Sequence, residues 1–127
     1  MAEGESELAA GIERRDEFTV EGPLVTNVGG TISAGVLSTP GMIGMMEGTC
    51  SVLAYENLPE GQATVGFEVC IKHVSAAAEG ATCRTHAVLR EVVEGRKLRF
   101  DVEVTEGDRT IGVGTHERRV VTFNQLG

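Results

Sequence analysis

Glu47 is the residue of this chain best suited to acid–base or nucleophilic chemistry. It is the sole charged residue between Gly41 and Tyr55, in a segment otherwise made of apolar and small side chains. An ionised carboxylate on an apolar helix face is costly unless it is paired, and such acids gather at functional sites. The alternative is an ordinary surface acid on a helix face that meets solvent or a loop.

His73 and Thr39 are two further candidates. His73 follows a segment in which the odd-numbered residues from Ala63 to Ile71 are all apolar. If it extends that strand face toward the helix, its imidazole is a natural proton shuttle; otherwise it is a strand-end residue in a loop. Thr39 precedes Pro40, where a hydroxyl either caps a helix or faces a substrate carbonyl.

A basic region lies in the C-terminal third of an otherwise acidic chain. Its members are Arg96, Lys97, Arg99, Arg118 and Arg119. Neighbouring side chains of a strand point to opposite faces, so only one of Arg118 and Arg119 can serve a given site. The region is either a phosphate clamp, since arginine forks suit phosphate oxygens, or a solvated strand face.

Other kinds of site find little support. Cys83 and His86 have the spacing of two metal ligands, but no second pair accompanies them, so we expect no metal site. His116-Glu117 lacks the second histidine of a metalloprotease helix. Glycine-rich nucleotide-binding loops and nucleophile elbows are absent from the sequence. We expect no cofactor.

Length and composition set the class of protein. The chain has 127 residues, of which 41% are hydrophobic and 24% charged, with a formal net charge of −8. These values are typical of one soluble domain without a nucleic-acid partner. No apolar run of membrane-spanning length and no signal peptide occur, and three cysteines without a C-x-x-C pair argue against a disulfide framework. We therefore expect a cytoplasmic protein with no membrane partner.

The elements that must position the candidates begin with two irregular segments. Residues 1–15 are polar and acidic and are expected to form a disordered tail, so that residues 16–127 form the domain. A first strand is predicted over residues 18–25. Residues 26–38 are Gly-rich and free of aromatic residues, as expected of a loop.

One helix is predicted between Pro40 and Asn57, with Ser38 or Thr39 as its N-cap. It is apolar nearly all round and should be buried. Its glycines at positions 41, 44 and 48 each cost about 1 kcal/mol in helix propensity. They therefore require something that packs close to the helix backbone.

Four strands are predicted after the helix, joined by short turns that make the last three antiparallel neighbours. They cover residues 63–73, 80–91, 98–104 and 110–123. One helix wrapped by one curved antiparallel sheet is the hotdog fold, of class α+β; a generic α+β domain is the alternative. The exposed sheet edges and apolar surface of such a domain favour dimerisation.

Four segments of the chain resemble the fluoroacetyl-CoA-specific thioesterases, a hotdog-fold family. They are TPGMIGMMEGTC (39–50), TVGFEVCIKHVSAA (64–77), VVEGRKL (92–98) and IGVGTHERRVV (111–121). The resemblance covers roughly residues 16–123. The order and spacing of Thr39, Glu47 and His73 match the catalytic set of that family.

This resemblance implies hydrolysis of a short-chain acyl-CoA thioester to a free acid and coenzyme A. It implies a homodimer, or a dimer of dimers, with active sites at the subunit interface. Glu47 would be the nucleophile or the water-activating carboxylate, His73 the general base and acid, and Thr39 a hydrogen-bonding member of the set. Gly66 would lie beside the acyl group and Arg118 near the ligand.

One segment departs from the family pattern. The fluoroacetyl-specific enzymes carry phenylalanines before the catalytic threonine, which form an apolar lid. Residues 26–38 contain none, and Gly30 and Ser33 stand at about the corresponding positions. We therefore expect a broader short-chain acyl-CoA thioesterase.

Two other functions of the fold must be weighed. A non-catalytic module could bind an acyl-CoA or a small ligand with the same architecture. A hydratase of this fold would use an Asp and a His near the helix start. The sequence has no Asp between Asp16 and Asp101, which argues against the hydratase.

Overall fold

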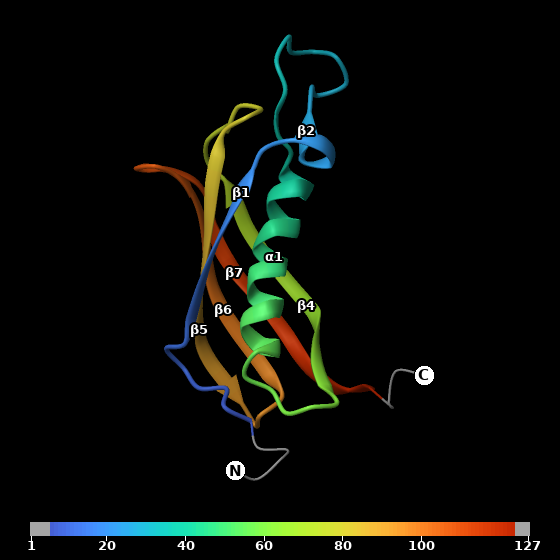
Figure 1. The fold of residues 1–127 in the computed structure, drawn as a ribbon, viewed down its shortest axis with the longest axis vertical. Helices are drawn as coiled ribbons and strands as arrows, with labels where there is room; N and C mark the ends of the chain where they lie inside the picture. Colours follow the sequence, from blue (N-terminus) through green and yellow to red (C-terminus); the bar gives the residue numbers. More distant parts are fainter. Residues whose placement is uncertain (1–5, 124–127) are drawn as a thin grey trace.

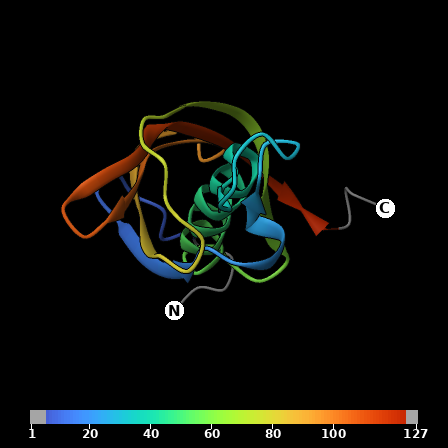
Figure 2. The ribbon, with the colours of Figure 1, turned by 90° about the horizontal axis from the view of Figure 1, so that it is seen from above.

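The computed structural model describes residues 6–123, in which one curved sheet wraps around one helix (Figures 1 and 2). The main elements are β1 (Glu13–Thr19), α1 (Thr39–Tyr55), β4 (Gln62–His73), β5 (Thr82–Val93), β6 (Lys97–Glu106) and β7 (Arg109–Thr122). The sheet has the strand order β1-β5-β6-β7-β4 and all its pairs are antiparallel. This arrangement confirms the α+β hotdog fold predicted from the sequence.

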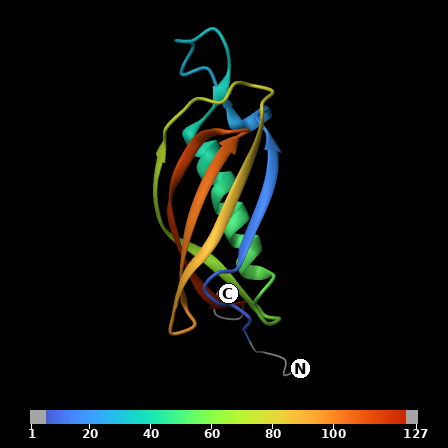
Figure 3. The same cartoon turned by 90° about the vertical axis from the view of Figure 1, so that its left-hand side faces the viewer.

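A short excursion precedes the helix. It contains the 3-10 turn η1 (Gly22–Leu24) and a small antiparallel pair, β2 (Val25–Thr26) and β3 (Val36–Leu37). Residues 27–35 form a loop that extends beyond the N-terminal end of α1 (Figure 3). The strand expected over 18–25 is therefore wrong as a single element. Gly22 has a φ of 56° and Pro23 has no N–H, and both interrupt strand pairing.

The N-terminal segment differs from the expected disordered tail wherever the structure describes it. β1 already begins at Glu13, which pairs with Val88 of β5. The Glu7 backbone N–H donates to the Asn57 carbonyl at 2.8 Å, and Leu8 and Ile12 pack against the core. The two apolar side chains anchor an otherwise acidic segment. The remainder of the expected tail, residues 1–5, and residues 124–127 lie outside the described residues.

Helix α1 begins as predicted, and Ser38 is its N-cap. The Ser38 Oγ accepts a hydrogen bond from the Gly41 N–H at 2.9 Å, which leaves the Thr39 hydroxyl free for another role. The buried helix residues are Met42, Met46, Thr49, Cys50, Leu53 and Ala54. They contact the inner face of the sheet, whose buried side chains include Leu98, Phe100, Val102 and Val104.

The helix is not buried all round, contrary to the expectation from its sequence. Val52 and Tyr55 are 40% and 58% exposed. A Cβ at Gly44 or Gly48 would have nothing within 4 Å, so the close packing expected at these two glycines is not supplied by the described chain. The sheet covers one side of α1 and leaves this face open. Within the described residues, no helix is long and apolar enough to cross a bilayer.

Strand β4 contains an irregularity that decides which side chains face the helix. Its pairing with β7 shifts between Gly66 and Glu68, so that Phe67 is an extra, bulged residue. We expected the odd-numbered residues 63–71 to share one face, but Phe67 is 62% exposed on the outer side. The bulge reverses the alternation, so the inner face carries Gly66 before it and Val69 and His73 after it.

Candidate active site

Thr39 and His73 are brought together at the N-terminal end of α1. A hydrogen bond of 2.9 Å joins Thr39 Oγ1 to His73 Nδ1. The other ring nitrogen of His73, Nε2, is buried and has no hydrogen-bond partner among the described residues. The pair therefore presents an oriented imidazole with one nitrogen available for proton transfer.

Glu47 lies farther along α1, against β4 and β7. Its Oε2 is 3.5 Å from Arg118 Nη1 and 3.9 Å from His116 Nε2, and its side chain is 42% exposed. A Cβ built on Gly66 would come within 2.8 Å of the same oxygen, so the strand needs a glycine where the carboxylate rests. The carboxylate is thus held beside a cation and remains open to a reactant.

Arg118 points into this site and is 6% exposed. Its Nε donates to Thr64 Oγ1 at 2.6 Å, and its Nη2 donates to the Thr64 carbonyl at 3.0 Å. Its Nη1 donates to His116 Nε2 at 3.1 Å. Burial lowers the pKa of Arg118, and the Glu47 carboxylate opposes that effect. An arginine so enclosed fits a role at the carboxylate rather than a phosphate clamp on the surface.

His116 belongs to the same cluster, although sequence reasoning considered it only as a fragment of a metalloprotease motif. Its Nδ1 donates to the Glu68 carbonyl at 2.8 Å, which leaves Nε2 as the acceptor for Arg118. Burial lowers the pKa of His116, with the Glu68 hydrogen bond acting in the opposite direction. His116 and Arg118 are two residues apart on a strand, so their side chains share one face. This spacing was the sequence signal that could have identified His116 as a neighbour of Arg118.

The three residues of the predicted catalytic set are not all together within one chain. Thr39 and Glu47 are eight residues apart on α1, which corresponds to roughly 12 Å along the helix axis. One chain therefore contains a Thr39–His73 pair at one place and a Glu47–Gly66–Arg118 cluster at another.

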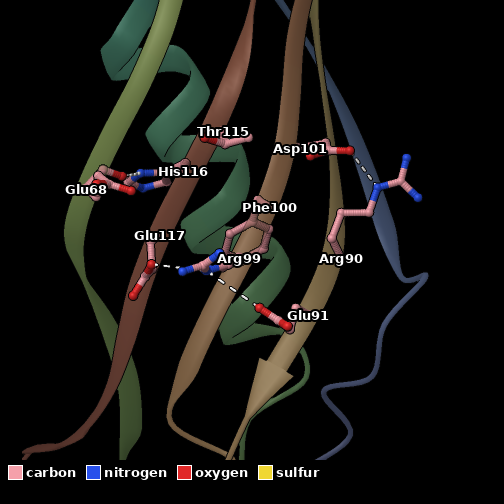
Figure 4. A pocket seen from close by; sticks show the side chains of 9 residues that line it. All are labelled: Glu68, Arg90, Glu91, Arg99, Phe100, Asp101, Thr115, His116 and Glu117. Atoms are coloured by element: carbon pink, nitrogen blue, oxygen red, sulfur yellow. Dashed lines mark hydrogen bonds and ion pairs between the residues drawn. The ribbon is translucent and has the colours of Figure 1, made fainter.

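Two further members of the basic region, Arg99 and Arg119, lie on the outer face of the sheet. Arg119 stacks over the Phe67 ring at 3.6 Å and also pairs with Glu117. Figure 4 shows Arg99 beside Glu91 and Glu117, with N–O distances of 3.6 and 3.3 Å. Because these charges are already paired with one another on the face away from α1, they add nothing to the Glu47 cluster.

No group of His, Cys, Asp or Glu that could hold a metal ion occurs in the part of the chain covered by residues 6–123. Cys83 is buried, whereas His86 binds Glu13 on β1 at 2.7 Å. The two residues of the C-x-x-H spacing therefore do not form a joint site.

Comparison with known sequences gives a consistent result. The family model described as "Fluoroacetyl-CoA-specific thioesterase" matches residues 20–124. The fluoroacetyl-CoA thioesterase of Streptantibioticus cattleyicolor is 38% identical over 91 residues, covering 72% of this chain and 65% of that protein. The matched part thus spans just under two thirds of the relative's length.

Solved structures show the same fold. The fluoroacetyl-CoA thioesterase FlK superposes with a TM-score of 0.83 at 29% identity, covering 94% of this chain and 92% of that one. A point mutant of FlK in complex with fluoroacetate and CoA gives 0.83 at 28% identity, covering 94% and 100%. A Thermus thermophilus member of the thioesterase superfamily gives 0.82 at 25% identity, covering 93% and 87%. The chain belongs to the fluoroacetyl-CoA-specific thioesterase family.

Proposed function

We propose that this protein hydrolyses a short-chain acyl-CoA thioester to the free acid and coenzyme A, with Thr39, Glu47 and His73 as its catalytic set. The observation that carries the proposal is the 2.9 Å contact between Thr39 Oγ1 and His73 Nδ1, which leaves Nε2 buried and without a hydrogen-bond partner in residues 6–123. Membership in a thioesterase family supports the choice of a thioester as substrate.

We also propose that each complete site forms between two copies of the chain, as a homodimer that could pair further into a dimer of dimers. Within one chain, roughly 12 Å of helix separates Thr39 from Glu47. The open face of α1 and the edge strand β4 lie next to each other and carry exposed apolar side chains, namely Val52, Tyr55, Val65, Phe67 and Val69. A second copy on this surface would cover them and supply the missing member of each set.

The chemistry then follows from the residues. The Glu47 carboxylate either attacks the thioester carbonyl carbon, forming an anhydride that a water molecule then hydrolyses to the free acid and Glu47, or removes a proton from the water that attacks the carbonyl carbon directly. The C–S bond breaks, and His73 gives a proton to the departing thiolate of coenzyme A. Backbone N–H groups near Gly66 or at the start of α1 would stabilise the oxyanion. Arg118 would hold Glu47 in place, and the missing side chain at Gly66 leaves room for the Glu47 carboxylate, beside which the acyl group would lie.

The proposal also includes several short acyl groups as substrates and the cytoplasm as the cellular compartment. The loop 27–35 carries no aromatic side chain, which suits several short acyl groups better than one. Cys50, Cys70 and Cys83 are all free thiols, consistent with a reducing cytoplasm. Neither a nucleic acid nor a membrane is needed as a partner.

Subunit mixing tests this proposal directly. Glu47→Gln and His73→Asn homodimers should each be inactive, with coenzyme A release from acyl-CoAs followed by a thiol reagent. After joint refolding at equal amounts, half of the dimers are mixed and each holds one intact site, so about a quarter of the wild-type activity should return. A Thr39→Ala with His73→Asn mixture is the matched control and should show no activity beyond the average of the two homodimers, because both changes affect the same half of the site.

Two outcomes would contradict the proposal. Mixed dimers that form but remain inactive would show that the site does not span two chains. Tight binding of acyl-CoA by the wild-type protein without any turnover would instead identify a non-catalytic binding module.

A further inference from the structure

We propose that neutral His116 keeps the Glu47 carboxylate available for reaction by accepting a hydrogen bond from Arg118, and that protonation of His116 removes this acceptor and stops hydrolysis. His116 is then a positioning residue that acts through Arg118, in addition to the set of Thr39, Glu47 and His73. The inference rests on the proposed function and adds a control by pH to the same site.

The Arg118 guanidinium is held more closely by Thr64 and His116 than by Glu47. Its Nε and Nη2 donate to Thr64 Oγ1 and to the Thr64 carbonyl at 2.6 and 3.0 Å, and its Nη1 donates to His116 Nε2 at 3.1 Å. The distance from Nη1 to Glu47 Oε2 is longer, at 3.5 Å. Because Arg118 is only 6% exposed, these acceptors decide where its N–H groups point. His116 therefore draws Nη1 away from a tight ion pair with Glu47.

The two neighbours of the His116 ring both require the same neutral tautomer. His116 Nδ1 lies 2.8 Å from the Glu68 carbonyl, the first carbonyl after the bulge of β4 (Figure 4). A carbonyl only accepts hydrogen bonds, so Nδ1 must carry the proton. A guanidinium only donates, so Nε2 must be free of one. The site as built therefore depends on an imidazole that holds a single proton, on Nδ1.

A second proton on His116 would reverse the interaction with Arg118. It binds to Nε2, so two N–H donors and two positive charges then face each other across 3.1 Å in a buried place. The acceptor nearest to both is Glu47 Oε2, which lies 3.5 Å from Arg118 Nη1 and 3.9 Å from His116 Nε2. Both cations therefore turn to the carboxylate, and Glu47 is no longer free to act on a thioester or on water.

The surroundings of His116 determine the pH at which it gains that proton. The groups around it and its neighbours are Glu47 and Cys50 of α1, the Glu68 carbonyl of β4, the Phe100 ring of β6 and Arg118 of β7. Burial lowers the pKa of His116, the Glu68 hydrogen bond opposes this, Arg118 lowers it further and Glu47 raises it. Burial raises the pKa of the Cys50 thiol to about 12, so Cys50 stays neutral. His116 is therefore neutral at pH 7, and hydrolysis is lost below the ordinary histidine pKa of about 6.5.

NMR of the full chain labelled with ¹⁵N histidine and arginine tests the tautomer and the titration. The chain has three histidines, and the signals lost in His116→Gln identify those of His116. At neutral pH its Nδ1 should be protonated and its Nε2 bare. As the pH falls, the His116 signals and the Arg118 Nε–H signal should shift with one common midpoint. A ring that carries its proton on Nε2, or that stays neutral until the protein unfolds, would overturn the proposal.

The pH dependence of hydrolysis tests the consequence for activity. A Gln at position 116 offers an amide oxygen to Arg118 but takes up no proton, so kcat/KM of wild type is compared with that of His116→Gln at each pH. Titrations of Glu47 and His73 occur in both proteins and cancel in this ratio. The ratio of wild type to variant should fall with decreasing pH along a one-proton curve, with the midpoint that NMR gives for His116. A ratio that stays constant through that midpoint would show that the His116 proton does not control the site.

Two further variants separate the hydrogen bond from the proton. Thr64→Val is the matched control: it removes the acceptor of Arg118 Nε without removing a titrating group, so kcat/KM should fall about tenfold or more, by the same factor at every pH. His116→Phe fills the space of the ring without an acceptor and should be about tenfold less active than His116→Gln at neutral pH. Equal activity of the Phe and Gln variants would reduce His116 to a packing role and overturn the proposal. If the Phe variant does not fold, the Gln variant alone carries the test.

The NMR readouts do not depend on turnover, so the two proposals can fail separately. A wild-type protein that hydrolyses no acyl-CoA would overturn the proposed function, while matching midpoints of His116 and Arg118 would leave the coupling between these side chains standing. An active thioesterase whose Arg118 signal ignores the titration of His116 would do the reverse.

Discussion

The carboxylate of Glu47 occupies the space that a side chain on residue 66 would need. A Cβ on Gly66 would lie 2.8 Å from Glu47 Oε2. Helix α1 and strand β4 therefore meet where the Glu47 carboxylate packs against the backbone of Gly66. Arg118 Nη1 lies 3.5 Å from Glu47 Oε2 on one side, and the open face of α1 lies on the other. In the proposed function, a thioester carbonyl would approach the carboxylate from this open side.

Replacing Glu47 by Gln should abolish turnover without unfolding the protein. The amide keeps the shape and can still accept a hydrogen bond from Arg118, but it cannot act as nucleophile or base. We expect kcat to fall by at least about a thousandfold. Because the side chain is 42% exposed, the free energy of unfolding should change by less than about 1 kcal/mol, as measured with urea. A purified variant with near-wild-type kcat would contradict the assignment.

Ser38 and Thr39 should separate stability from activity. Ser38→Ala removes the N-cap hydrogen bond to Gly41 and should cost about 1 kcal/mol in the free energy of unfolding, with kcat retained. Thr39→Ala removes the contact with His73 and should lower kcat while stability stays near wild type. Thr39→Ser should recover most of the activity. If Thr39→Ala destabilised the protein as much as Ser38→Ala, Thr39 would belong to the helix cap.

Arg118→Met should impair acyl-CoA and acyl-pantetheine hydrolysis by the same factor. The guanidinium is buried against Glu47, so its loss affects the reacting end of the substrate and not the nucleotide. Loss of a hydrogen bond from a charged group, at about 1.5–3 kcal/mol, predicts a fall in kcat/KM of about 10- to 150-fold. Arg119→Met on the outer face is the control and should change little. A much larger effect on acyl-CoA would assign Arg118 to the phosphates.

His116 should make the fold less stable as the pH falls. Burial lowers the pKa of His116 in the folded state, so between that pKa and about 6.5 the unfolded chain binds more protons. The free energy of unfolding should therefore rise with pH up to about 6.5 and then level off. His116→Gln should flatten this slope. Urea titrations should stay above about pH 5. The pKa of Glu117 is lowered in the folded state, mainly by its hydrogen bond from Arg119, so protonation of Glu117 at more acidic pH further reduces the free energy of unfolding.

Selectivity for fluoroacetyl-CoA over acetyl-CoA should be modest. Val28 and Ile32 are 54% and 38% exposed on the loop, and apolar contacts of this kind separate similar substrates by roughly 1–3 kcal/mol. The ratio of kcat/KM values should stay well below about 10⁴. Ser33→Phe should raise the ratio; Gly30 has a φ of 88°, so Phe would be strained there. A wild-type ratio above about 10⁴ would reveal a specificity device outside this loop.

The sequence predicted α1 and the strands β4 to β7 well because each has a strong local signal, whereas β1, β2 and β3 were misplaced or missed. The cap and proline at the start of α1, and the alternation in β6, determine structure over short distances. The phase of β4 could not be predicted, since a bulge depends on how Gly66 and Phe67 meet β7. The distance between Glu47 and Thr39 follows from the rise per residue of a helix, so it could have been predicted from the sequence. His116 was missed because its role requires Arg118 and the Glu68 carbonyl together.

The bulge at Phe67 also limits which insertions and deletions strand β4 can tolerate during evolution. Between Gly66 and His73, losing or gaining one residue would turn every later side chain of β4 to the opposite face. His73 would then point to solvent, away from Thr39, even with every amino-acid type preserved. Residues 66–73 can therefore accept substitutions at outward-facing positions, but they cannot accept an insertion or a deletion of one residue.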